Sequence, residues 1–200
     1  MKHAIILAHP SKDSFNASVA AAYAEAAEEL GHACVTRDLY ALGFDPVLKA
    51  AERPDGEEHA APADVVRERE ILADCDVFAF IYPIWFGTPP AMMKGYVERV
   101  FNYGFAFSAF KGGRAEPLLA GRELVSFTTS GATKAWLEEN GVWLSLRTIF
   151  DDYIAKVCGL KVADHVHFAS IAPEMKERWV LENLETVRGH VRRLFGGRHR

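Results

Sequence analysis

The stretch Val77–Phe101, VFAFIYPIWFGTPPAMMKGYVERVF, contains a strand, a loop and a helix in direct succession. Its first part, Val77–Tyr82, is continuously apolar or aromatic, which is typical of a strand buried on both faces of a parallel sheet. Thr88 is expected to cap a helix that begins at Pro89-Pro90, because proline lacks the N–H group that a first helical turn leaves unpaired. This stretch therefore predicts one strand–loop–helix unit of an α/β fold.

The same succession of strand and helix repeats along the whole chain. We expect strands at Ala4–Ala8, His32–Leu39, Val77–Tyr82, Glu123–Thr128 and Val162–Ala169, and helices between Ser11 and Gly31 and at Asp64–Ala73, Pro89–Phe101, Leu144–Val157 and Glu174–Phe195. Five strands that alternate with helices predict a three-layer α/β domain with a parallel sheet and right-handed crossovers. We expect one domain over residues 1–195, loops at 41–62 and 102–120, and a frayed tail at 196–200.

Composition and charge exclude several classes of protein. The 200 residues, half of them hydrophobic and a quarter charged, are ordinary for one globular domain. A net charge of −4 gives no electrostatic reason to bind nucleic acid. The apolar runs are too short for a signal peptide or a membrane span. Three cysteines without a C-x-x-C motif argue against a disulfide framework and against a metal site, and favour the reducing cytoplasm.

Three loops follow the strands at the edge where open α/β sheets bind their ligands. The first, His9–Asn16, opens a helix whose unpaired N–H groups attract anions, and it matches neither the dinucleotide nor the Walker A motif. The second places Trp85 and Phe86 at a strand end, where a flat ligand such as a flavin needs apolar walls. The third is Thr128–Gly131. Alternatively, the first loop only caps its helix and the two aromatic rings only pack beneath the next one.

Five motifs carry a resemblance to a known family. They are Ala8-His9-Pro10 with Ser14-Phe15-Asn16, Asp38-Leu39-Tyr40 with Phe44-Asp45-Pro46, Tyr82–Pro89 running into Lys94–Phe101, Gly104-Phe105-Ala106-Phe107, and Thr128–Gly131. In this order they resemble the NAD(P)H:quinone oxidoreductases of the flavodoxin-like superfamily. The resemblance implies a doubly wound five-stranded sheet of order 2-1-3-4-5, a bound flavin and a homodimeric active unit.

The resemblance also assigns roles to individual residues. It implies that the flavin is bound by His9, Ser14, Phe15 and Asn16 on its phosphate side, by Pro83, Ile84, Trp85 and Phe86 along its ring, and by Thr128, Thr129, Ser130 and Gly131 at its pyrimidine edge. Phe105 and Phe107 match aromatic residues of the family's substrate pocket, and Glu98 matches a position near the partner subunit's cofactor. The mammalian enzymes carry a Tyr and a His after the third loop, where this chain has Trp136 and Val142. In the mammalian enzymes this Tyr and His form a proton relay that stabilises the reduced flavin, so in this chain the relay is expected to be absent or rebuilt. Trp136 is expected on the substrate side, and Tyr153, His165 and His167 are unassigned candidates for a rebuilt relay.

The function implied is a flavin-dependent NAD(P)H:quinone oxidoreductase that works by a ping-pong mechanism. Members of this family that bind FAD hold its adenosine with the segment after the last strand. That segment, Ala169–Arg178, is short here, but Arg178 could reach a phosphate, so we expect FAD, with FMN as the alternative. A second reading is a flavin-bearing ancillary subunit of a bacterial potassium-efflux system. A flavodoxin-type electron carrier fits less well, since such carriers are markedly acidic, and a fold that has lost its ligand is the remaining alternative.

Overall fold

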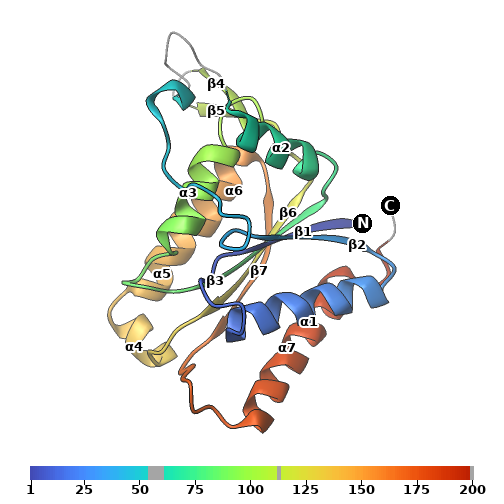
Figure 1. Ribbon diagram of the computed structural model, residues 1–200, viewed down its shortest axis with the longest axis vertical. Helices are drawn as coiled ribbons and strands as arrows, with labels where there is room; N and C mark the ends of the chain where they lie inside the picture. The colour runs from blue at the N-terminus through green and yellow to red at the C-terminus, as the bar shows by residue number, and fades with distance from the viewer. Residues whose placement is uncertain (54–60, 112–113, 199–200) are drawn as a thin grey trace.

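The computed structural model describes residues 1–53, 61–111 and 114–198, and its centre is a five-stranded parallel sheet (Figure 1). The strand order is β2-β1-β3-β6-β7, with all neighbours parallel. This is the expected order 2-1-3-4-5, because β4 and β5 lie outside the sheet. The strands are β1 (Lys2–Leu7), β2 (Ala33–Asp38), β3 (Val77–Pro83), β6 (Glu123–Thr129) and β7 (Lys161–Phe168).

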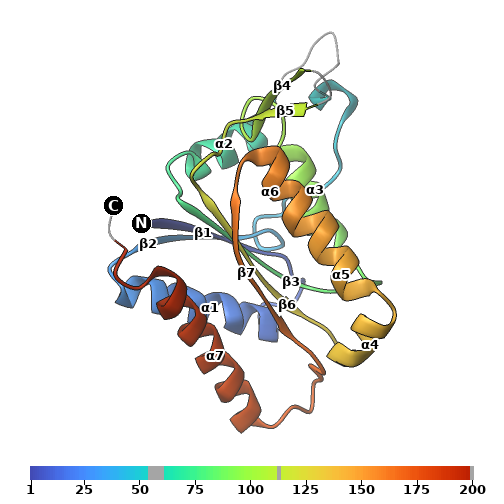
Figure 2. The same ribbon diagram turned by 180° about the vertical axis from the view of Figure 1, so that it is seen from behind.

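Helices cover both faces of the sheet (Figures 1 and 2). One face carries α1 (Phe15–Glu29) and α7 (Glu177–Phe195). The other carries α2 (Ala63–Leu72), α3 (Ala91–Val100) and the run of α5 (Val142–Leu146), the π-helical turn η2 (Arg147–Asp152) and α6 (Tyr153–Cys158), with the short α4 (Lys134–Glu139) before it. The predicted three-layer α/β architecture is therefore confirmed.

Alternation along the strands divides the core into two layers. Successive side chains of a strand point to opposite faces, so Ile5 and Leu7 pack beneath α1 and α7. Ala4 and Ile6 of the same strand pack on the other side, in the cluster that includes residues of α3 and α6. All four are at most 4% exposed, which explains why β1 reads as a continuous apolar run and not as an alternating one.

Several local expectations needed correction. The segment 102–120, expected as a loop, contains the antiparallel hairpin of β4 (Phe107–Lys111) and β5 (Arg114–Pro117), which forms a separate two-stranded sheet. Its pairing is irregular between residues 107 and 110, so a regular alternation of apolar and polar residues could not reveal it. Residues 50–52 of the expected loop 41–62 form a 3₁₀ turn, η1 (Ala50–Glu52), and 54–60 lie outside the described residues.

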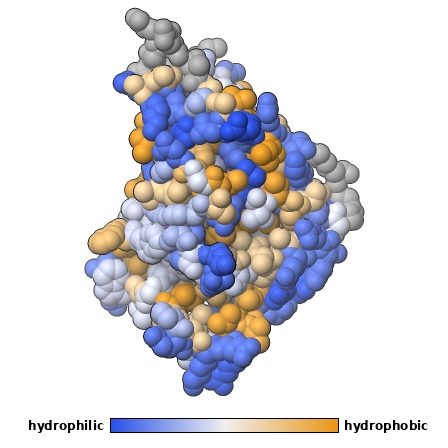
Figure 3. All heavy atoms as spheres, viewed as in Figure 1, coloured by the Kyte–Doolittle hydropathy of each residue, from blue (hydrophilic) through white to orange (hydrophobic). Residues whose placement is uncertain are grey.

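The end of the chain, as far as the structure describes it, contacts His32 and Glu123. In the predicted tail, Arg198 O lies 2.9 Å from His32 Nε2 and Arg198 Nη1 lies 2.8 Å from Glu123 Oε1, whereas residues 199–200 lie outside the described residues. On the face drawn in Figure 3, hydrophobic residues form small patches separated by hydrophilic ones. In the part of the chain that the structure describes, every helix is too short or too polar to cross a membrane.

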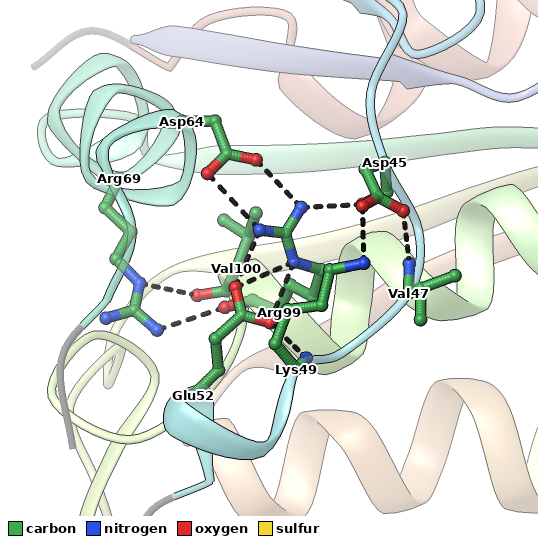
Figure 4. A network of polar contacts seen from close by, with 8 residues as sticks. All are labelled: Asp45, Val47, Lys49, Glu52, Asp64, Arg69, Arg99 and Val100. Carbon is green, nitrogen blue, oxygen red and sulfur yellow. Dashed lines mark hydrogen bonds and ion pairs between the residues drawn. The ribbon is translucent and has the colours of Figure 1, made fainter. Parts of the chain in front are cut away.

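A buried arginine fastens the segment after β2 to α3 (Figure 4). Arg99 is 4% exposed, and its guanidinium donates to Glu52 Oε1 at 2.6 Å, to Asp64 Oδ2 at 2.8 Å and to Asp45 O at 2.6 Å. Burial acts to raise the pKa of Glu52, but the hydrogen bonds from Arg99 and from Lys49 N, together with the positive charge of Arg99, outweigh it and hold this pKa below its usual value. Arg69 donates to the carbonyl oxygens of Arg99 and Val100 at 3.1 Å, which satisfies two acceptors at the end of α3.

Gly95, one turn before Arg99 on α3, allows this segment to approach the helix. A Cβ atom at Gly95 would lie 2.1 Å from Pro46 O and 2.5 Å from Pro46 Cβ. The glycine and arginine of the Lys-Gly-Tyr-Val-Glu-Arg motif (Lys94–Arg99) therefore act together: one makes room for the segment at residues 45–52 and the other binds it.

We expect Gly95→Ala to lower the free energy of unfolding by about 1–3 kcal/mol, because the new methyl group collides with backbone atoms that cannot move independently. Gly189→Ala on α7 is the matched control. Nothing lies within 4 Å of a Cβ atom at Gly189, so this change should raise the free energy of unfolding by about 0.5–1 kcal/mol through helix propensity. Urea denaturation measures both, and effects of equal sign would contradict the assigned role of Gly95.

Candidate functional site

The three predicted loops meet at the carboxyl edge of the sheet. A cavity of about 160 Å³ is lined by residues from all of them, together with one residue that follows β7: His9, Phe15, Asn16, Pro83, Ile84, Trp85, Thr129, Ser130, Gly131 and Ile171. The loops are also bonded to one another. Asn16 Nδ2 donates to Thr129 Oγ1 at 2.9 Å, and Ile84 N donates to Thr129 O at 2.7 Å.

The first loop surrounds the start of α1 with polar groups. Ser14 caps the helix, since its Oγ accepts from Ala17 N at 3.1 Å. The N–H groups of Phe15 and Asn16 make no hydrogen bond to another described residue. The positive end of the helix dipole therefore faces this loop with free donors. A second cavity, of about 510 Å³, adjoins it and is lined by His9, Ser11, Asp13, Ser14, Phe15, Ser18, Ile171, Ala172, Pro173, Met175 and Val180.

The second loop is a tight turn that pushes two aromatic rings outward. Trp85 and Thr88 exchange backbone hydrogen bonds of 3.0 and 3.1 Å, and both residues between them have positive φ, 51° at Phe86 and 76° at Gly87. Trp85 is 42% exposed and Phe86 is fully exposed. The ring centroids of Trp85 and His9 lie 5.9 Å apart, and both residues line the 160 Å³ cavity. The turn therefore presents an apolar surface, and Phe86 is too exposed to have a packing role within the chain.

Thr88 belongs to this turn and does not cap α3. Its Oγ1 donates to Trp85 O at 3.2 Å, whereas Pro90 occupies the N-cap position and the helix begins at Ala91. The expected cap at Thr88 was therefore wrong, because the hydroxyl closes the turn that precedes the helix.

A third cavity, of about 400 Å³, opens on the outer side of the same turn. It is lined by Ile84, Phe86, Gly87, Ser130, Gly131, Ala132, Trp136, Leu137 and Val142. Trp136 of α4 lines this cavity and is half-exposed. The cavity shares Ile84, Ser130 and Gly131 with the 160 Å³ cavity, so the two are adjacent.

Phe105 and Phe107 do not join this site within one chain. Phe107 begins β4, which lies at the opposite end of the molecule from α4 (Figures 1 and 2). Phe107 and Glu98 line a fourth cavity, of about 540 Å³, between α3 and α6. Phe105 packs on Phe101, with ring centroids 5.9 Å apart. Their predicted role in a substrate pocket therefore requires a second copy of the chain.

The third loop divides its side chains between the cavity and the interior. Ser130 and Gly131 line the cavities, and Thr129 binds Asn16. The Thr128 side chain is buried and lies between two histidines of β7, His165 and His167. Sequence reasoning left both histidines unassigned. Among the described residues, no three His, Cys, Asp or Glu side chains are grouped so as to hold a metal ion.

The chain is similar to known oxidoreductases in sequence and in structure. A family model described as flavodoxin-like fold matches residues 1–191. The chain is 31% identical over 172 residues to an uncharacterized NAD(P)H oxidoreductase of Haemophilus influenzae, covering 86% of this chain and 85% of that protein. The NAD(P)H:quinone oxidoreductase of Methanothermobacter marburgensis superimposes with a TM-score of 0.77 at 29% identity, covering 100% and 99% of the two chains. An FMN-dependent NADH-azoreductase of Bacillus anthracis, solved with FMN, shares the fold with a TM-score of 0.73 at 18% identity, covering 96% and 98%.

Proposed function

The chain belongs to the flavodoxin-like fold family, and we propose that it is a flavin-dependent NAD(P)H oxidoreductase that passes two electrons to a quinone or a similar small molecule. The observation that carries this proposal is the meeting of three loops around one cavity, between a helix N-terminus with free N–H donors and an outward-facing aromatic turn. The Haemophilus and Methanothermobacter relatives, both named as NAD(P)H oxidoreductases, support the activity.

The donors and surfaces present fit a flavin phosphate and its ring. Free N–H groups of Phe15 and Asn16, with the hydroxyls of Ser11 and Ser18 nearby, suit a phosphate at the start of α1. A flat ring suits the apolar wall of Trp85 beside the loop at Ser130. When bound, the flavin supplies the hydride and electron chemistry that no side chain here can perform.

The chain's own residues would bind the flavin, orient it and shield it from water. The Trp85–Thr88 turn is held by main-chain bonds, so it presents a rigid wall to the ring. The neighbouring 400 Å³ cavity, with Phe86 and Trp136 in its lining, is open for a nicotinamide and afterwards for the acceptor. Both substrates would use the same cavity in turn, which predicts ping-pong kinetics.

We favour FMN over FAD as the flavin, in place of the expectation from the sequence. Arg178, which was expected near a phosphate, lies with its guanidinium 5.7 Å from the Trp179 ring and is not part of the cavity lining at α1. The Bacillus anthracis azoreductase, which shares the fold, holds FMN. Mass spectrometry of the flavin released by heat decides between the two.

A homodimer would bring the missing aromatic residues to the site. Along α5, η2 and α6, the exposed fractions are 72% for Leu144, 66% for Ile149 and 61% for Tyr153, beside the groove that Phe107 lines. Exposed apolar surface of this kind commonly marks an interface, and two-fold pairing is its commonest form. Light scattering should give twice 22.2 kDa, whereas a single chain that reduces quinones would argue against the shared pocket.

Purified protein tests the proposed function directly. We expect it to be yellow and to oxidise NADH or NADPH in the presence of a quinone, with parallel double-reciprocal plots. Colourless protein that also fails to quench the fluorescence of added FMN or FAD would refute the flavin site. Flavin binding without quinone reduction would support the flavin site but refute quinones as the class of acceptor.

A further inference from the structure

A continuous row of polar side chains runs from the interior of the protein to the candidate flavin cavity. It begins at Asp151 of η2, whose Oδ2 contacts His165 Nδ1, and both side chains are at most 1% exposed. His165 Nε2 lies 2.8 Å from Thr128 Oγ1, and the same oxygen lies 2.9 Å from His167 Nδ1. His167 Nε2 lies 3.0 Å from Ser130 Oγ, which lines both cavities.

Strand register produces this row. Ser126, Thr128 and Ser130 alternate along one face of β6 and its following loop, and β7 pairs with β6 so that His165 stands opposite Ser126 and His167 opposite Thr128. His165, Thr128 and His167 therefore lie on two neighbouring strands, whereas Asp151 lies on η2 and Ser130 in the loop that follows β6.

The positions of the protons follow from the outer end inward. The Ser130 hydroxyl has one proton, and its Oγ lies 2.8 Å from Ala132 O, which can only accept, so His167 Nε2 donates to Ser130. A neutral His167 then accepts at Nδ1 from the Thr128 hydroxyl, and Thr128 accepts from His165 Nε2. His165 thus carries a proton on Nε2, while its contact with Asp151 needs another. The Asp151–His165 pair therefore holds two protons, one on Nε2 and one between Nδ1 and Asp151 Oδ2. A neutral imidazole beside a carboxylate would hold only one.

The surroundings support this arrangement. Burial first, and then the nearby His165, lower the pKa of His167 to about 4, which keeps it neutral at ordinary pH. Lys134 acts on His167 in the same direction. The Trp143 ring covers both histidines, at 4.7 Å from His165 and 5.3 Å from His167, and shields them from water.

Two further groups lie close to Asp151. Ser126 Oγ donates to Asp151 Oδ1 at 2.8 Å and so satisfies the other carboxylate oxygen. The buried Tyr82 hydroxyl has no partner among the described residues, and its pKa is raised by burial and by Asp151, so it stays protonated. A nucleophilic role for Thr128 is excluded, because Thr128 is 0% exposed and no substrate can reach its hydroxyl.

We propose that Asp151, His165, Thr128, His167 and Ser130 form a buried proton wire, in which the Asp151–His165 pair stores a proton and Ser130 presents it at the cavity. This proposal rests on the proposed function, since two-electron reduction by hydride leaves a negative charge that a proton must balance. Ser130 would touch the cofactor and is the catalytic member. The other four are positioning residues that act through it.

The transfer balances atom by atom. The Ser130 hydroxyl turns from Ala132 O, which also accepts from Ser170 N, and gives its proton to the acceptor in the cavity. Its Oγ takes the proton of His167 Nε2, His167 Nδ1 takes that of Thr128, and Thr128 takes that of His165 Nε2. Asp151 and His165 are left as a carboxylate and a neutral imidazole, so the charge of the row falls by one. The electrons come from NAD(P)H, and the next proton returns from solvent along the same row.

The first test does not depend on a flavin. Nitrogen-15 NMR of the histidine rings in the purified wild-type protein at neutral pH, with His165→Gln and His167→Gln for assignment, reports which ring nitrogens carry protons. We expect a proton on Nε2 of His165 and none on Nδ1 of His167. The reverse pattern at either nitrogen would overturn the wire, whether or not the protein binds flavin.

The second test uses the flavin-loaded protein and compares Thr128→Val with Thr128→Ser. Valine has the size of threonine but interrupts the wire, whereas serine keeps the hydroxyl. Equilibration with a dye of known potential should show that the equilibrium constant for two-electron reduction falls about tenfold or more in Thr128→Val, as expected for a lost hydrogen bond to a charged group. Thr128→Ser should stay close to wild type.

The two failures are distinguishable. Thr128→Val that binds flavin and keeps the wild-type equilibrium constant would overturn the wire and leave the proposed function intact. If no variant and no wild-type protein binds flavin, the proposed function fails, and the ring-nitrogen spectra still decide whether the proton order exists. Should Thr128→Val not fold, Asp151→Asn, which removes the carboxylate far from the cavity end, is expected to show the same loss.

Discussion

Arg99→Ala is expected to lower the free energy of unfolding by about 3–5 kcal/mol, the usual effect of removing one partner of a buried ion pair. The reason is the charge that remains. Glu52 is 6% exposed and pairs with Arg99, so the variant leaves a buried carboxylate without its ion-pair partner, although Lys49 N still donates to it. Asp45 O and Asp64 lose donors at the same time. Chemical denaturation followed by circular dichroism measures the change.

Lys94→Ala is the matched control on the same helix. Lys94 pairs with Glu98 one turn away, but both side chains are about half exposed, so their ion pair contributes no more than about 1 kcal/mol. The double variant Arg99→Leu with Glu52→Leu should recover part of the loss, because it removes both buried charges. If Arg99→Ala and Lys94→Ala cost the same, the buried network does not stabilise the fold.

The stabilisation by this network also depends on pH. The pKa of Glu52 in the folded chain is below its usual 4.5, so the contribution is present above pH 4.5 and is lost as the pH falls through the folded-state value. Wild-type protein should therefore lose more stability than Arg99→Ala between neutral and acidic pH, and the difference between them should shrink.

The sheet could be predicted because its central strands are buried on both faces. Ala4–Ala8 and Val77–Tyr82 read as continuous apolar runs, and each leads into a loop and a helix. The β4–β5 hairpin could not be predicted, since its pairing is short and irregular and it packs outside the main sheet. The π-helical turn at Arg147–Asp152 was also invisible, because the segment keeps a helical pattern of apolar residues through it.

The loops of the candidate site were predictable, but the residues behind them were not. Strand ends lie at one edge of a parallel sheet by geometry, so the meeting of His9, Trp85 and Ser130 follows from topology. Asp151 gave no signal, because one acid in a helix does not reveal which face it occupies. A signal did exist in the strands: Ser126, Thr128 and Ser130 alternate as polar residues, and so do His165 and His167, which indicates a buried polar stripe on two neighbouring strands.

The two tryptophans, Trp85 expected along the flavin ring and Trp136 expected on the substrate side, line different cavities. Trp85 lines the 160 Å³ cavity shared by all three loops, whereas Trp136 lines only the outer 400 Å³ cavity. A planar ring stacked on an aromatic side chain is stabilised by about 1–3 kcal/mol in nucleic-acid complexes. Of the two tryptophans, only Trp85 would be placed to make a comparable contact to the proposed flavin ring.

We therefore expect Trp85→Ala to raise the Kd for the flavin about tenfold or more, at roughly 1.4 kcal/mol per tenfold change, and Trp136→Ala to leave it nearly unchanged. The turn should survive the substitution, because its hydrogen bonds join the backbones of Trp85 and Thr88. Trp136→Ala should instead raise the KM for the quinone, since it widens the outer cavity. Fluorescence titration of flavin-free protein with FMN gives the two Kd values, and Trp85→Phe serves as the control that retains an aromatic ring. Equal flavin affinity in the two alanine variants would show that the ring does not lie against the Trp85 side chain.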